Sequence, residues 1–208
     1  KKSVPIHNGI HLEEFRHTFA FRHARPYILS IANLHWYKGT DVLLMAFAKI
    51  ATAYPDIDLM LVGDGSYKDT RLGLTHLLGI SSRVIFTGQI ASRTKVIEFI
   101  NGCEFFVLPS RYEPFGIANL EAMAAGKAVI TTDAGGCPEV VKHRVNGIVV
   151  KAKNDSALAE AMKELITNKE LCKTYGKAGK EMVSAFTWDI IYKKYLDVYN
   201  RIMPRERS

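Results

Sequence analysis

Cysteines are few in this sequence, and those present lie far apart. Only three cysteines occur among the 208 residues, Cys103, Cys137 and Cys172, and no two of them form a CxxC pair. A small, odd number of separated cysteines argues against a disulfide framework and favours a reducing compartment. His35, His76 and His143 are also scattered along the chain. We therefore expect no zinc site and assign the cysteines to packing.

Long apolar segments and long basic runs are missing as well. No apolar run approaches the roughly 18 residues that suggest a membrane span. The opening, KKSVPIHNGIHLEEF, has no Met and no signal-peptide pattern, so we expect a piece of a longer protein. The net charge is +7, but Lys and Arg never form a run longer than two. We interpret this as a basic surface and expect no nucleic-acid partner; attraction for phosphates or for an anionic membrane face is the alternative.

The signatures of two common enzyme classes are also absent. No GxSxG motif is present, which argues against the nucleophile elbow of serine hydrolases. A dinucleotide-binding oxidoreductase would need GxGxxG after its first strand and an acidic residue about twenty positions later. The segment IANLHWYKG, which includes the end of the first predicted strand, does not supply that motif.

The sequence does contain a regular alternation of short β-branched runs and longer helical patterns. Most of the short runs are continuously apolar, which is typical of parallel strands that are covered on both faces. The sequence therefore predicts an α/β protein with a doubly wound, parallel, six-stranded, Rossmann-like sheet. Strands are predicted at 27–32, 58–63, 83–88, 104–110, 128–133 and 147–150, and helices at 40–54, 67–79, 92–101, 116–125 and 136–142.

After residue 153 the strands stop and further helices follow. One is predicted to begin at the possible caps 154–156, and two more near 168–184 and 188–203. The last helix carries aromatic residues at 188, 192, 195 and 199, a spacing that indicates a packing stripe against some surface. We expect one domain over 1–208, with a sheet core at about 25–150 and a helical part at about 154–203.

Ligands of such sheets bind beyond the carboxyl ends of the strands, so functional residues should lie in the loops that follow them. After the fourth strand, Glu113 precedes Pro114, which favours an extended conformation. Gly116 then leads into a helix whose first backbone N–H groups have no internal partner and can bind an anion. A glycine at this position also allows close approach of a ligand to the backbone.

Glu121 lies on the same predicted helix, in the middle of residues that should be buried. At about 100° per residue it shares a face with small side chains and points away from Asn119. Helical side chains lean toward the N-terminus, so we expect Glu121 and Glu113 to converge on one crevice. The alternative is that Glu121 pairs with a lysine and Glu113 is a surface residue near the helix dipole.

Three other loops give weaker signals. The GDG segment at 63–65 could admit a phosphate or only make a tight turn. Lys38, in NLHWYKG at 33–39, offers a point charge suited to phosphate or is an ordinary surface lysine. The glycines of DAGGCPEV at 133–140 could serve only to bend the chain into a short helix.

Taken in order, these loops resemble a known pattern. The chain is similar to the C-terminal, donor-binding domain of retaining GT-B glycosyltransferases of family 4 (glycosyl transferases group 1). The spacing E-x7-E from Glu113 to Glu121 is the most specific element, and the likeness covers nearly the whole chain. It is carried by IHNGIHLEEF, KGTDVLLMAFAKI, LMLVGDGSYKDTR, VIFTGQI, EPFGIANLEAMAAGKAVITTDAGGCPEVV and NGIVV.

The resemblance implies a role for each matching residue. Glu121 would accept hydrogen bonds from the ribose hydroxyls of a nucleotide, and Glu113 would contact the donor sugar and help to stabilise the transition state. Lys38 would bind the diphosphate and stabilise the leaving group. The remaining implied contacts are main-chain N–H groups for the sugar at Phe115, Gly116 and Ile117, the pyrophosphate near Ala118 and Asn119, the base near Gln89 and Ile90, and further donor contacts at Asn33 and Gly63.

The resemblance also implies a reaction. The donor would be a UDP-, GDP- or ADP-sugar, and transfer to a polysaccharide, oligosaccharide or lipid acceptor would retain the anomeric configuration without metal or cofactor. Charge on the departing diphosphate can be met by Lys38 and a helix N-terminus. Paired glutamates alone would suggest a glycosidase, but a front-face reaction is implied here instead.

Two departures from the family pattern qualify these expectations. Many members carry Arg where this chain has Asn33, so leaving-group stabilisation would rest more on Lys38. An N-terminal, acceptor-binding domain is absent from these 208 residues, so we expect weak nucleotide binding and little transfer by the chain alone. The alternatives are a non-catalytic sugar-nucleotide-binding module and a GT-B epimerase or phosphorylase. We expect the full-length protein in the cytoplasm, with peripheral association at the inner membrane face as one setting.

Overall fold

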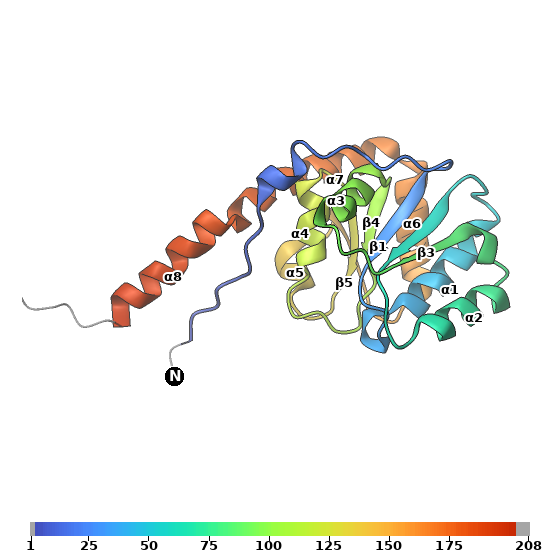
Figure 1. Ribbon diagram of the computed structural model, residues 1–208, viewed down its shortest axis with the longest axis horizontal. Helices are drawn as coiled ribbons and strands as arrows, with labels where there is room; N and C mark the ends of the chain where they lie inside the picture. The colour runs from blue at the N-terminus through green and yellow to red at the C-terminus, as the bar shows by residue number, and fades with distance from the viewer. Residues whose placement is uncertain (1–2, 203–208) are drawn as a thin grey trace, which may run out of the picture.

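A single parallel sheet forms the centre of the computed structural model, which describes residues 3–202 (Figure 1). Its strand order is β3-β2-β1-β4-β5-β6, and every neighbouring pair is parallel. This confirms the predicted six-stranded, doubly wound sheet. The strands are β1 Tyr27–Ile31, β2 Asp58–Val62, β3 Val84–Gly88, β4 Phe105–Leu108, β5 Val129–Thr132 and β6 Gly147–Val150.

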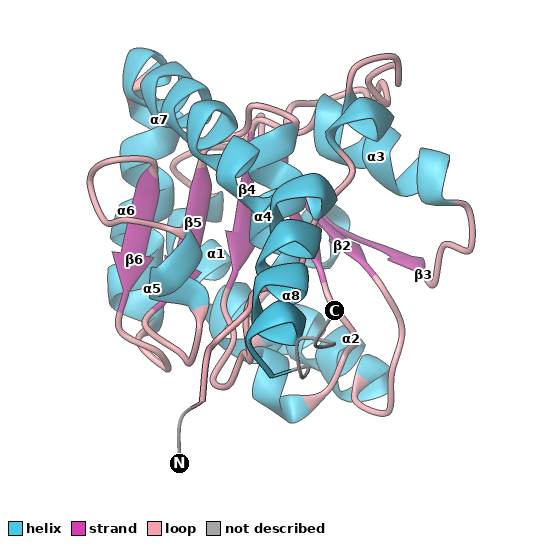
Figure 2. Cartoon of the chain, turned by 90° about the vertical axis from the view of Figure 1, so that its left-hand side faces the viewer, coloured by secondary structure: helices cyan, strands magenta, loops and turns pink. Residues whose placement is uncertain are grey.

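Helices connect the strands and cover both faces of the sheet (Figure 2). The expected helix over 136–142 is a single short turn, because Val141 adopts an extended conformation directly after it. The α-helices are α1 Thr40–Ala51, α2 Lys68–Leu77, α3 Arg93–Gly102, α4 Ile117–Ala124, α5 Cys137–Val140, α6 Asp155–Thr167, α7 Lys169–Met182 and α8 Trp188–Ile202. Short 3-10 turns are η1 Leu12–Phe15, η2 Trp36–Lys38, η3 Ser81–Arg83 and η4 Val183–Phe186.

The core has two layers, one on each face of the sheet. Successive strand residues point to opposite faces, so in β1 Ile28 packs against α1 and α6 whereas Leu29 packs against α3 and α4. Both of these side chains are fully buried, and the other central strands show the same alternation. Continuous apolar runs in the sequence are therefore explained by two-sided burial.

The strand order reverses between β1 and β4, and this is where the loops after the two strands meet. Gly39 lies in the β1–α1 loop with φ 66°, and a Cβ atom at this position would lie 2.0 Å from the carbonyl oxygen of Pro109 in the β4–α4 loop. Arg111 and Tyr112 donate backbone N–H groups to the carbonyl of Tyr37 at 2.7 and 3.3 Å. The two loops are thus held against each other at the point where open α/β sheets bind ligands.

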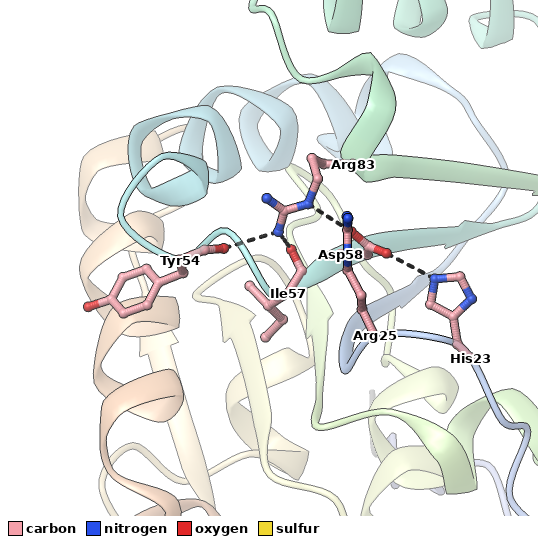
Figure 3. Close-up of polar contacts among 6 residues, drawn as sticks. All are labelled: His23, Arg25, Tyr54, Ile57, Asp58 and Arg83. Atoms are coloured by element: carbon pink, nitrogen blue, oxygen red, sulfur yellow. Dashed lines mark hydrogen bonds and ion pairs between the residues drawn. The ribbon is translucent and has the colours of Figure 1, made fainter.

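At the opposite end of the sheet, where the strands begin, a cluster of charged residues joins the loops (Figure 3). Asp58, at the start of β2, accepts a hydrogen bond from Arg83 Nε at 2.8 Å, and His23 Nε2 lies 2.9 Å from its other oxygen. Arg25 Nη1 lies 3.4 Å from Asp58 Oδ1, the oxygen that Arg83 also contacts. Burial opposes the charge of Asp58, but Arg83, His23 and Arg25 together hold the pKa of this carboxyl below its usual value.

Helix α8 projects from the body of the molecule beside the N-terminal segment (Figure 1). Its first turn is anchored, because Ile10 and Thr187 form a parallel bridge and Ile191 is fully buried. The aromatic stripe expected to pack is open instead, since Tyr192 and Tyr199 are 61% and 55% exposed. Trp188, the first aromatic residue of the stripe, lies against Gly9 and His11 of the N-terminal segment. The three tyrosines that follow are exposed among the described residues. Between residues 3 and 202, no helix combines the length and apolar character that a membrane crossing requires.

Candidate functional site

Lys38 and Glu113 form an ion pair across the point where the strand order reverses. Lys38 Nζ donates to Glu113 Oε2 at 2.8 Å, and Ser110 Oγ donates to the same oxygen at 3.2 Å. Glu113 is only 8% exposed, so the interpretation of this residue as an exposed surface glutamate is wrong. Lys38 comes from the end of η2 after β1, and Glu113 comes from the loop after β4. The topology therefore brings together two residues that are 75 positions apart.

Two adjacent cavities open beside this pair. The first, which we call the Glu113 cavity, has a volume of about 330 Å³ and is lined by Asn8, Ile31, Lys38, Leu108, Glu113 and residues 114–118. The second, the Gln89 cavity, has a volume of about 250 Å³ and is lined by Ile31, Ala32, Asn33, Lys38, Val62, Gly63, Gln89, Ile90 and Val96. Lys38 and Ile31 line both cavities, so Lys38 stands between them. Most of the residues predicted from the sequence are brought together here.

The start of helix α4 forms one wall of the Glu113 cavity. Gly116, the N-cap, has φ 91° and ψ 51°, and a Cβ atom there would lie 2.9 Å from Asn119 Nδ2. Ile117 and Ala118 follow and line the cavity. The first N–H groups of a helix have no partner within it and favour negative charge. The wall opposite Lys38 can therefore hold an anion or hydroxyl groups.

The side chain of Asn119 points into the core. Its side chain is fully buried, with Nδ2 donating to Thr131 Oγ1 at 3.3 Å, and its backbone N–H donates to the carbonyl of Gly116 at 2.9 Å. Asn119 Oδ1 has no hydrogen-bond partner among the described residues. Asn119 therefore supports helix α4 from beneath and lines neither cavity.

Glu121 is also separate from Glu113. Its Oε1 accepts a hydrogen bond from Arg93 Nη1 at 2.5 Å, and Glu121 is not among the residues that line either cavity. The alternative expectation of an ion pair was right in kind, but the partner is an arginine and not a lysine. Burial raises the pKa of the Glu121 carboxyl, and Arg93 offsets only part of this effect. In this structure the two carboxylates do not open into one crevice.

Several contributing residues were not anticipated from the sequence. Gly135 has φ 53° and would place a Cβ atom 2.0 Å from the carbonyl oxygen of Glu113, and Gly136 donates its N–H to that oxygen at 3.0 Å. The paired glycines thus support the Glu113 loop and do more than bend the chain. Asn8, in the N-terminal segment, lines the Glu113 cavity, where the neighbouring His7 ring stacks on Phe115 at 5.1 Å.

One of the missed residues did have a local signal. Arg93 is the first residue of α3, where a cation is unfavourable because the helix dipole is positive at that end. A cation in such a position needs compensation from elsewhere in the fold. For the glycines and Asn8 the sequence holds no comparable signal. Among residues 3–202, no group of three or more His, Cys, Asp or Glu is arranged to hold a metal ion.

The chain is similar in sequence to known glycosyl transferases. A family model described as glycosyl transferases group 1 matches residues 12–182. A GDP-mannose-dependent alpha-(1-6)-phosphatidylinositol monomannoside mannosyltransferase of Mycobacterium tuberculosis is 33% identical over 181 residues, which are 83% of this chain and 47% of the relative. The chain spans about half the length of the curated relatives that it matches.

Two solved structures have the same fold. Sucrose-phosphate synthase of Thermosynechococcus elongatus superposes with a TM-score of 0.83 and 28% identity, over 95% of this chain and 52% of that one. The C-terminal domain of a glycosyl transferase group 1 family protein of Francisella tularensis superposes with a TM-score of 0.75 and 25% identity, over 85% of this chain and 97% of that one.

Proposed function

The chain belongs to the glycosyl transferases group 1 family, and we propose that it binds the nucleotide-sugar donor of a retaining, metal-independent glycosyl transfer. The observation that carries this proposal is the Lys38–Glu113 pair between two cavities, beside the N-terminus of α4. Apart from its ribose, a nucleotide-sugar joins a base, a diphosphate anion and the transferred sugar in one line. The Gln89 cavity, Lys38 and the Glu113 cavity offer a place for each in the same order.

Lys38 is the group that meets the diphosphate. When the bond between the anomeric carbon and the phosphate oxygen breaks, negative charge develops on the diphosphate, and the Lys38 ammonium lies where it can stabilise this charge. An ammonium carries three N–H donors, so Lys38 can keep its bond to Glu113 while it binds a phosphate oxygen. The N–H groups at the start of α4 supply further stabilisation.

Glu113 is placed for the sugar. Its carboxylate is buried, and among residues 3–202 the donors Lys38 and Ser110 engage only its Oε2. A carboxylate oxygen that is not engaged accepts hydrogen bonds from sugar hydroxyls, and its charge stabilises positive charge at the anomeric carbon in the transition state. Glu113 is therefore proposed as the residue that contacts the transferred sugar, and Glu121 as the residue that accepts the ribose hydroxyls.

Binding of nucleoside diphosphates tests the proposal directly. Calorimetry with UDP, GDP and ADP should detect binding of at least one of them by the 208-residue chain. Lys38→Met removes the charge at the diphosphate and should weaken that binding about tenfold or more. Lys49→Met is the matched control, because Lys49 forms an ion pair with Asp155 away from the cavities. Absence of binding by all three at millimolar concentration would contradict the proposal.

Glu113→Gln separates transfer from binding alone. In a protein that contains the preceding acceptor-binding half, this variant should lower the rate of sugar transfer far more than it lowers nucleotide affinity. Equal losses of both would favour a non-catalytic binding module.

We also propose that the full-length protein acts in the cytoplasm at the inner face of a membrane. The net charge of +7 supports this, as does the phosphatidylinositol-linked acceptor in the name of one relative. Co-sedimentation with anionic but not with neutral vesicles is the expected result.

A further inference from the structure

Glu14, Arg93 and Glu121 form a continuous chain of ion pairs beside the cavities. Arg93 Nη1 donates to Glu121 Oε1 at 2.5 Å, and Arg93 Nε donates to Glu14 Oε2 at 3.0 Å. The guanidinium also lies over the ring of Phe15, 5.6 Å from its centroid. The three residues come from η1, α3 and α4, so the contact joins three elements that are separate in sequence.

Glu121 is the most buried of the three side chains. The side chains of Arg93 and Glu14 are 44% and 37% exposed, whereas that of Glu121 is 13% exposed. Glu14 and the buried ring of Phe15 therefore contact one side of the arginine, and the arginine contacts the more buried carboxylate of Glu121. A planar guanidinium with fixed donors is suited to setting the orientation of a carboxylate.

The Arg93 contact leaves Glu121 free to bind a second group. Only Oε1 is engaged, and among residues 3–202 Oε2 has no hydrogen-bond partner. A carboxylate offers about four acceptor positions on its two oxygens. Two neighbouring hydroxyls can therefore bind to Glu121 while Arg93 stays in place.

The charge on Glu121 depends on this arrangement. Burial raises the pKa of Glu121, Arg93 lowers it, and Glu14 raises it slightly from a greater distance. For Arg93 burial acts against the charge, but Glu121 and Glu14 raise the pKa of the guanidinium above its usual value. The other helices packed on α4, namely α5, α7 and η4, contribute no charged group to Glu121 among the described residues.

We propose that Arg93 is a positioning residue for nucleotide recognition, which fixes the Glu121 carboxylate so that it accepts the two hydroxyls of a ribose, with Glu14 holding Arg93 in place. This inference rests on the proposed function, in which Glu121 is the ribose acceptor. It assigns a role to a residue outside the E-x7-E element and links ribose binding to the turn η1.

The test compares ribonucleotides with 2′-deoxyribonucleotides. The nucleoside diphosphate that wild type binds most tightly and its 2′-deoxy analogue are titrated into wild type, Arg93→Met, Arg93→Lys and Glu14→Gln between pH 5 and pH 8. Arg16→Met is the matched control, because Arg16 forms an exposed ion pair with Glu13. Thermal unfolding of each variant shows whether it is folded.

Arg93→Met should weaken ribonucleotide binding about tenfold and weaken the 2′-deoxy analogue much less. Without Arg93, the pKa of Glu121 is higher. As the pH is lowered, this variant should therefore lose nucleotide affinity earlier, at a higher pH than wild type does. Arg93→Lys should recover part of the loss, and Glu14→Gln should cause a smaller loss in the same direction. Arg16→Met should behave as wild type.

Equal or tighter ribonucleotide binding by Arg93→Met would overturn the inference, because it would mean that Arg93 is dispensable or competes with the ribose. Should Arg93→Met fail to fold, Arg93→Lys and Glu14→Gln decide, and the inference fails if neither reduces the preference for ribose. Failure of the proposed function looks different. In that case wild type binds no nucleoside diphosphate, or Glu121→Gln leaves the affinity unchanged.

Discussion

Gly116 determines how helix α4 begins and therefore how its first N–H groups face the Glu113 cavity. Its φ of 91° is unfavourable for any residue with a side chain, and an added Cβ atom would meet the buried amide of Asn119 at 2.9 Å. Two separate costs thus act at this residue: backbone strain and a contact with a neighbour that has no room to move. The sequence suggested glycine here for ligand approach, and the structure adds a conformational requirement.

Gly116→Ala should lower the free energy of unfolding by about 2 kcal/mol and also weaken nucleotide binding, because both costs are imposed on the wall of the cavity. Urea denaturation and calorimetry measure the two effects. Gly73→Ala is the matched control: this exposed glycine in α2 has no atom within 4 Å of an added Cβ. That variant should be more stable than wild type by about 0.5–1 kcal/mol. A Gly116→Ala protein as stable as wild type would contradict the argument.

At the scale of elements, the two ends of the parallel strands carry different arrangements of charged residues. At the carboxyl ends of the strands, Lys38 and Glu113 line a cavity where a ligand can reach them. At the end where the strands begin, Asp58 lies in a cluster with His23, Arg25 and Arg83. Arg83 also donates to the carbonyls of Tyr54 and Ile57 (Figure 3). The first arrangement is suited to binding, and the second fixes the loop ends before β1, β2 and β3.

Asp58→Asn should destabilise the protein at neutral pH by about 2 kcal/mol or more, because it leaves Arg83 without its anionic partner in a mostly buried position. The pKa of Asp58 is lower in the folded state than in the unfolded chain. The stabilisation that ionised Asp58 gives the folded state is therefore complete above the unfolded-chain pKa of about 3.9. It is lost as the pH falls through the lower pKa of the folded state. Denaturant unfolding from pH 7 to pH 3 should show the difference between variant and wild type shrinking at the acidic end.

Asp56→Asn serves as the control for this prediction, since Asp56 is exposed and lies two residues away. It should leave the stability nearly unchanged. A constant difference between Asp58→Asn and wild type across the whole pH range would show that the loss comes from packing and not from the charge.

For the whole molecule, the most distinctive feature is the uncovered stripe on α8. Helix α8 projects from the body of the molecule (Figure 1). Its tyrosine side chains are exposed, although their spacing indicates a packing surface. The chain also spans about half the length of its curated relatives. From both observations we propose that this donor-binding unit works together with an acceptor-binding half.

The 208-residue chain alone should therefore bind nucleotide but transfer little sugar. An assay that follows release of nucleoside diphosphate from UDP-, GDP- and ADP-sugars, with and without saccharide acceptors, measures this directly. A protein that also contains an acceptor-binding half should transfer sugar faster. Robust transfer by the chain alone would contradict the proposal.

The sequence by itself determined the sheet, its parallel arrangement and the loops that carry the site, because apolar runs and helical periodicity are local patterns. It also identified most of the cavity-lining residues, since these follow directly after strands. Only the tertiary structure decided which side chains meet. Lys38 reaches Glu113 across 75 residues and Arg93 reaches Glu121 across 28, and no local pattern specifies either partner. The glycine pair beneath Glu113, the burial of Asn119 and the open face of α8 were settled in the same way, because packing depends on neighbours that are distant along the chain.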